Sequence, residues 1–173
     1  MPRPTVARIH LDNLRHNYRL ACDQAAPARA MAVVKADGYG HGIERVAGAL
    51  ARETDQFAVA CLEEAMALRA AGLRHPVLLM QGVHEGPDLR LCEAEGFTVV
   101  VHDPHQLAWF EAGYGKPEVW IKVNTGMNRL GFAPAETGAV RDRLVTAGVR
   151  VTGVMTHFAC ADDLHSDGTA VQT

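Results

Sequence analysis

The chain has 173 residues, of which 48% are hydrophobic, so it is long enough to bury one sizeable core. Its formal net charge is −3 and it has no basic cluster, which argues against nucleic acid as a partner. No apolar run reaches membrane-spanning length, no apolar signal region opens the chain, and the four cysteines are scattered singly; we therefore expect a cytoplasmic protein with no membrane partner.

Helical and strand patterns alternate along the chain. Asp12 is the predicted cap of a helix that runs to about Cys22, and a first strand over 30–34 leads into Lys35. The later patterns predict helices over 43–52, 63–71, 87–94 and 134–147, one more opening at 103–104, and strands over 57–61, 77–80, 97–101, 119–123 and 149–156. A polar tail begins near Asp162, and within it residues 162–165 are expected to be solvated.

Six strands that alternate with helices predict an α/β fold with a parallel sheet and crossover helices. Lys35, Arg129 and His157 fall at or just beyond the carboxyl ends of predicted strands. Both (β/α)8 barrels and doubly wound sheets place their sites at that end, so the pattern leaves both architectures open.

The octapeptide 35–42, Lys-Ala-Asp-Gly-Tyr-Gly-His-Gly, is the most informative segment of the chain. A lysine at the end of a buried strand projects its amine into the cavity beyond, where desolvation favours the neutral amine that Schiff-base chemistry requires. The alternating glycines can adopt positive φ and let the backbone pass close to a ligand. A surface lysine that opens a solvated turn is the alternative interpretation.

This octapeptide resembles the pyridoxal-phosphate attachment segment of bacterial alanine racemases. Two further segments resemble motifs of the same family in the same order: Trp120–Phe132, which contains Arg129, and Met155–Asp162, which contains His157. The resemblance runs from about residue 5 to about residue 162. It implies a (β/α)8 TIM-type barrel, because the N-terminal domain of that family is a barrel.

The resemblance also implies roles for individual residues. Lys35 would form the internal aldimine with pyridoxal 5'-phosphate and act as one of two catalytic bases. The hydroxyl of Tyr39 would help to hold the cofactor phosphate, Arg129 would reach its phenolic oxygen, and His157 would lie beside its ring. Arg129 and Met127 are the candidates for binding the substrate.

Lys122 lies among apolar residues in a predicted strand, where an unpaired ammonium is costly. Strand alternation places Lys122 on one face with Trp120 and Asn124, which in a barrel would be the inner face. Many racemases of this family carry a carbamylated lysine here, an anion that positions the arginine, and we expect the same of Lys122. A lysine paired with a nearby carboxylate is the alternative.

No metal site is expected. His102 and His105 are three residues apart, but a helix-opening proline separates them and no third ligand is evident. The glycines at 38, 40 and 42 lack the spacing of a nucleotide-binding fingerprint.

A complete barrel takes roughly 250 residues, so we expect residues 1–173 to be a partial N-terminal cofactor-binding barrel of about six βα units. The family's C-terminal β-rich domain is expected to be absent, and with it the opposite-face tyrosine that a partner subunit supplies in the full-length homodimers. The expected function is that of an alanine racemase, which converts L-alanine to D-alanine for peptidoglycan. The alternatives are a non-catalytic pyridoxal-phosphate homeostasis barrel and an inactive, marginally stable racemase fragment.

Overall fold

The computed structural model describes residues 5–173, so residues 1–4 of the predicted domain lie outside the described residues. The strands are β1 (Ala32–Val33), β2 (Phe57–Val59), β3 (Val77–Leu79), β4 (Thr98–Val101), β5 (Glu118–Lys122) and β6 (Val151–Met155). The helices are α1 (Leu11–Ala25), α2 (Lys35–Gly40), α3 (Ile43–Leu50), α4 (Leu62–Ala70), α5 (Asp88–Ala94), α6 (Pro104–Glu111), α7 (Thr137–Thr146), which follows the 3-10 turn η1 (Pro134–Glu136), and α8 (Gly168–Val171). Among these residues, no helix is both long and apolar enough to cross a membrane.

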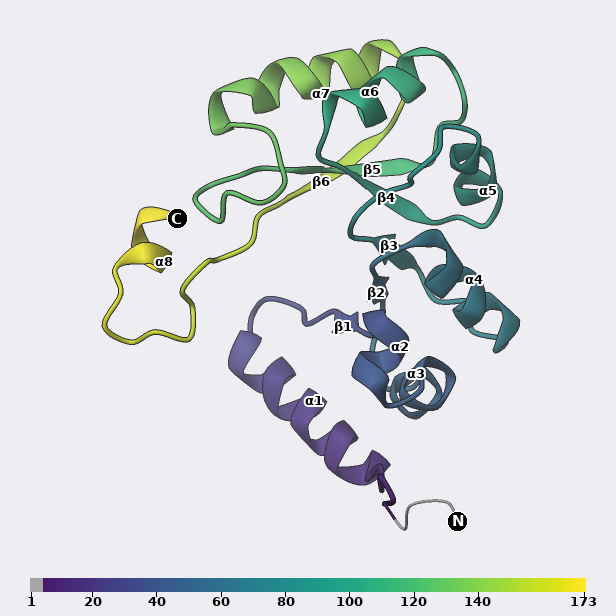
Figure 1. The fold of residues 1–173 in the computed structure, drawn as a ribbon, viewed down its shortest axis with the longest axis vertical. Coiled ribbons are helices and arrows are strands. Elements are labelled where there is room, and N and C mark those ends of the chain that lie inside the picture. Colours follow the sequence, from purple (N-terminus) through teal and green to yellow (C-terminus); the bar gives the residue numbers. More distant parts are fainter. Residues whose placement is uncertain (1–4) are drawn as a thin grey trace.

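The order of the strands decides between the two predicted architectures. All pairings are parallel, and the strands follow one another in space as they do in sequence, β1-β2-β3-β4-β5-β6. A doubly wound sheet reverses its direction at a switch point, whereas a barrel advances by one strand at each right-handed crossover. Figure 1 shows helices α3 to α7 along one side of the curved row of strands. The prediction of six units of a (β/α)8 barrel is therefore confirmed.

The two faces of the sheet bury different apolar clusters. Outward-facing side chains such as Val77 and Leu79 pack beneath the helices in the main core. Inward-facing Leu78 belongs to a small second cluster with Ala58 and Val100, against which Trp120 packs. Lys122, two residues beyond Trp120 on β5, lies on that inner face, as the alternation of the strand predicts.

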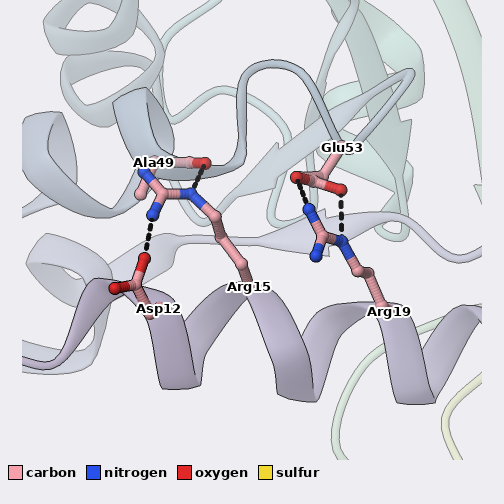
Figure 2. A network of polar contacts seen from close by, with 5 residues as sticks. All are labelled: Asp12, Arg15, Arg19, Ala49 and Glu53. Atoms are coloured by element: carbon pink, nitrogen blue, oxygen red, sulfur yellow. Dashed lines mark hydrogen bonds and ion pairs between the residues drawn. The ribbon is translucent and has the colours of Figure 1, made fainter.

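Helix α1 is tied to the end of α3 by a polar network (Figure 2). Arg15 Nε donates to the carbonyl oxygen of Ala49 at 3.0 Å, and Arg15 Nη1 donates to Asp12 Oδ1 at 2.6 Å. Arg19 donates to both carboxylate oxygens of Glu53, at 2.9 and 2.5 Å. Exposed pairs of this kind contribute little individually, so their effect is mainly to fix the direction of α1.

One local prediction is wrong and another is confirmed. Asp12 does not cap α1: the helix begins at Leu11, and the carboxylate of Asp12 bonds to Arg15 within the first turn. In the tail, residues 162–165 are exposed as predicted, and they are followed by α8 and by Gln172, which is 8% exposed. A four-residue helix carries too little apolar periodicity to be detected in a sequence.

Candidate functional site

Lys35 begins a left-handed turn at the carboxyl end of β1. The next four residues, Ala36, Asp37, Gly38 and Tyr39, have φ between 52° and 62° and ψ between 39° and 51°. For non-glycine residues this conformation costs roughly 1–2 kcal/mol each. The glycine-rich octapeptide does follow the strand as predicted, but the strain extends to three residues that the sequence does not mark.

Two carboxylates hold this turn in place. The backbone N–H of Ala36 donates to Glu64 Oε1 at 2.5 Å, and that of Ala60 donates to Glu64 Oε2 at 2.7 Å. Glu64 therefore ties the end of β1 to the end of β2. At the exit of the turn, the N–H of Ile43 donates to Asp37 Oδ1 at 2.8 Å. Glu64 is not among the predicted site residues, because its only local signal is its place in the first turn of a helix after a strand.

Three of the predicted residues line one pocket. Lys35 follows β1, Lys122 ends β5 and Arg129 lies in the loop after β5, and they face a shared pocket of about 160 Å³. The other residues lining it are Ala60, Met80, Gln81 and Leu130. The positively charged side chains thus converge at the carboxyl end of the sheet, the end at which barrels place their sites.

The charged side chains that line this pocket are all positive. Lys122 is 6% exposed, and burial, followed by the positive charges of Arg129 and Lys35, lowers its pKa. Partial desolvation of its ring, followed by the positive charges of Arg129, Lys122 and Lys35, lowers the pKa of His157. Among residues 5–173, none of these four side chains forms an ion pair with a carboxylate, so the alternative of a paired Lys122 is not observed. Uncompensated positive charge of this kind suits an anionic ligand.

Asn124 builds the loop that carries Arg129. Its Oδ1 accepts from the backbone N–H of Gly126 at 3.2 Å and of Asn128 at 2.9 Å, and its Nδ2 donates to Asn128 Oδ1 at 3.1 Å. The loop closes through the N–H of Phe132, which donates to the carbonyl of Lys122 at 3.0 Å. Asn124 is predicted only to share a strand face with Lys122, although asparagine and glycine at this spacing are typical of turns.

Gly131 closes this loop where no side chain fits. Its φ is +117°, and a Cβ there would lie 2.8 Å from the backbone nitrogen of Asn124 and 3.0 Å from the carbonyl oxygen of Lys122. We expect Gly131→Ala to lower the free energy of unfolding by about 2 kcal/mol, measured by urea denaturation.

The matched control is Gly138→Ala in α7, where a Cβ would meet no atom within 4 Å. Alanine is the better helix former, so this variant should be neutral or more stable by up to about 1 kcal/mol. Equal midpoints for the two variants would contradict the steric argument.

The other predicted residues lie outside the pocket of Lys35. Tyr39 is 59% exposed and lines a different pocket, which it shares with Tyr18 and Met31. Met127 is half-buried in the loop after β5 and does not line the Lys35 pocket. His157 is exposed just beyond β6, close enough to Arg129, Lys122 and Lys35 for their charges to lower its pKa.

The two histidines considered as metal ligands have different surroundings. His102 Nε2 lies 3.0 Å from the carbonyl oxygen of Gln81, while His105 is exposed at the start of α6. Within the described range 5–173, no group of three or more His, Cys, Asp or Glu residues is arranged to hold a metal ion.

The family model and the similar proteins of known function all name the same family. Residues 9–173 match the family described as "Alanine racemase, N-terminal domain". The alanine racemase of Marinobacter nauticus is 59% identical over 175 residues, covering 100% of this chain and 49% of that protein. The catabolic alanine racemase of Pseudomonas aeruginosa is 49% identical over 173 residues, which cover 98% of this chain and 48% of that protein.

Structural comparison agrees. The crystal structure of the biosynthetic alanine racemase from Pseudomonas aeruginosa superposes with a TM-score of 0.85 at 41% identity, over 94% of this chain and 46% of that one. The chain thus spans about half the length of the curated relatives it matches. From this match, and from a barrel sheet that brings the lysine and arginine motifs to one pocket, it follows that the chain belongs to the alanine racemase family.

Proposed function

We propose that residues 1–173 form part of the N-terminal cofactor-binding barrel domain of an alanine racemase, which interconverts L- and D-alanine. The observation that carries this proposal is the convergence of Lys35, Lys122 and Arg129 on one pocket, where no carboxylate of residues 5–173 forms an ion pair with any of the three. The family uses pyridoxal phosphate, and its phosphate and phenolate groups fit a pocket with unpaired positive charge.

Lys35, Arg129 and His157 would each have a different role in binding the cofactor and moving protons. The cofactor, when bound, supplies an electron sink for negative charge at the α-carbon of an amino acid. Lys35 would hold it covalently through Nζ and move a proton at one face of the α-carbon. Arg129 would donate to its phenolate oxygen, and His157, whose lowered pKa favours the neutral imidazole, would lie beside its ring.

Racemisation needs a second proton donor and acceptor at the opposite face. We propose that a tyrosine from the C-terminal β-rich domain of a partner subunit supplies it in a homodimer, as the family resemblance implies. Tyr39 remains the proposed ligand of the cofactor phosphate. Its side chain lines a different pocket and would have to turn toward the pocket of Lys35 to bind it. Met127, near Arg129 in the loop after β5, is the proposed substrate contact.

Lys122 is proposed as a carbamylation site. Its Nζ in the neutral form would bond to the carbon of CO2 and release one proton, which leaves a carboxylate beside Arg129. Two observations favour this step: the lysine is 6% exposed, and it forms no ion pair with any carboxylate in the described part of the chain. A carbamate would supply the negative charge that the pocket lacks.

We also propose a cellular context. Four free cysteines suit the reducing cytoplasm. Production of D-alanine for peptidoglycan is the proposed purpose of the reaction, and the similarity to a catabolic alanine racemase makes use of D-alanine as a nutrient the second candidate.

Borohydride trapping with pyridoxal phosphate, followed by peptide mapping, tests the proposed site. The chain has only three lysines, Lys35, Lys116 and Lys122, so each can be assigned separately. We expect one label per chain on Lys35 and none after Lys35→Ala, with exposed Lys116 as the internal control. Equal labelling of Lys116, or none at Lys35, would contradict the proposal. Exchange of the α-proton of alanine in D2O then separates a racemase domain from a non-catalytic cofactor-binding barrel.

A further inference from the structure

We propose that Gln172 is a positioning residue that holds the loop of Arg129 and the segment of His157 together over the cofactor pocket. The proposal rests on the function proposed above for that pocket. Gln172 immediately follows α8, in the tail that sequence patterns leave unassigned.

The side-chain amide of Gln172 both donates and accepts hydrogen bonds. Its Nε2 donates to Thr125 Oγ1 at 3.1 Å and to the carbonyl oxygen of His157 at 3.0 Å. Its Oε1 accepts from the backbone N–H of Ala159 at 2.8 Å. The side chain is 8% exposed, while its neighbour Val171 is 75% exposed. Gln172, the polar residue, is therefore buried while the apolar Val171 lies in solvent. This reversal of the usual pattern indicates that the hydrogen bonds of the Gln172 amide are structurally important.

The partners of Gln172 belong to the two segments that carry site residues. Thr125 lies in the same loop as Arg129, and its hydroxyl is 2.7 Å from that of Thr156, next to His157. A Cβ on Gly126 would lie 3.0 Å from Gln172 Cγ, so the loop also packs on the side chain. Figure 1 shows α8 beside the loop that follows β5.

Among residues 5–173, the bond between the hydroxyls of Thr125 and Thr156 is the one hydrogen bond that joins the loop 124–132 directly to the segment 156–159. Without the amide of Gln172, the loop and the segment after β6 would move more independently, and Arg129 and His157 would be held less firmly beside Lys35. We therefore expect the amide to affect the pocket more than the stability of the sheet.

The test compares Gln172→Ala and Gln172→Glu with Val171→Ala as the control on the same short helix. Hydrogen exchange is measured at residues 124–132 and 156–159 and, for the sheet, at 57–59 and 98–101; affinity is measured with pyridoxal phosphate. For Gln172→Ala we expect about tenfold faster exchange in the two segments and about tenfold weaker cofactor binding, with exchange in the sheet unchanged. Val171→Ala should match the natural chain.

The glutamate variant adds a signature that general destabilisation would not produce. Ionised, it can accept from Ala159 but cannot donate to Thr125; protonated, below a pH of about 4.3, it regains one donor. Exchange at 124–132 should therefore slow toward the natural rate as the pH falls, relative to Gln172→Ala at the same pH.

Two results would overturn the proposal: unchanged exchange at 124–132 in Gln172→Ala, or faster exchange spread equally over the sheet. If the natural chain fails to bind pyridoxal phosphate, the proposed function fails. The exchange data still decide in that case whether Gln172 joins the two segments.

Discussion

Replacing Glu64 by glutamine should lower the free energy of unfolding by about 2 kcal/mol and remove most of the labelling at Lys35 by pyridoxal phosphate and borohydride. Each carboxylate oxygen accepts one backbone N–H, from Ala36 and from Ala60. A glutamine keeps one acceptor and presents an NH2 group to the other N–H, which leaves that donor without a partner. Ala36 opens the strained left-handed turn, so losing its anchor should release the turn and misdirect Lys35.

Glu63→Gln provides the matched control. Glu63 lies in the first turn of α4 as Glu64 does, so the two variants change the net charge and the interaction with the helix dipole alike. Glu63 is exposed, and its carboxylate accepts neither the N–H of Ala36 nor that of Ala60, which both donate to Glu64, so its loss should leave labelling at Lys35 unchanged. Urea denaturation and peptide mapping of both variants are the measurements. If the Glu64 variant behaves like the Glu63 variant, the bridge between β1 and β2 does not support the turn.

Much of the fold can be predicted from the sequence because its signals are local. The apolar runs that become β2, β3 and β4 are buried on both faces, and Asp103 caps α6 with Pro104 in the first turn, as the pattern indicates. The choice between barrel and doubly wound sheet depends on which strands become neighbours, and no local pattern encodes this. The family resemblance predicts it correctly.

The candidate site divides in the same way. Lys35 and Arg129 stand in contiguous motifs and meet in one pocket, as expected. Glu64 and Gln172 act on partners 28 and 47 residues away in the chain, so their roles become visible only when the fold brings the segments together. The left-handed turn is a further case, because alanine and tyrosine, which stand in it at positions 36 and 39, give no sign of positive φ.

The last prediction concerns Lys122, whose replacement by methionine should stabilise the fold by about 1–3 kcal/mol at neutral pH. Methionine fills a similar volume without a charge, and Lys122 is 6% exposed with two other cations near it. Lys116→Met is the control, since Lys116 is exposed and its charge has little to lose by folding.

The pH dependence of this difference has a definite sign. Folding lowers the pKa of Lys122 from an unfolded value of about 10.4. Below the lowered pKa, both states carry the proton and the folded chain bears the full cost of a buried charge. As the pH rises from the lowered pKa to the unfolded one, the folded state releases its proton first, so stability increases and the advantage of Lys122→Met disappears. A gap between the two melting temperatures that stays constant to pH 11 would contradict this account.

Bicarbonate separates the two ways in which the charge can be relieved. If Lys122 forms a carbamate, bicarbonate should stabilise the natural chain near pH 8 and have no effect on Lys122→Met, because only the lysine can add CO2. The anion so formed would lie beside Arg129, so Lys122→Met should bind pyridoxal phosphate more weakly even while it melts at a higher temperature. A more stable fold with a weaker site is the expected result where a buried charge is kept for function rather than for stability. A variant that gained both stability and affinity would remove the reason for a lysine at this position.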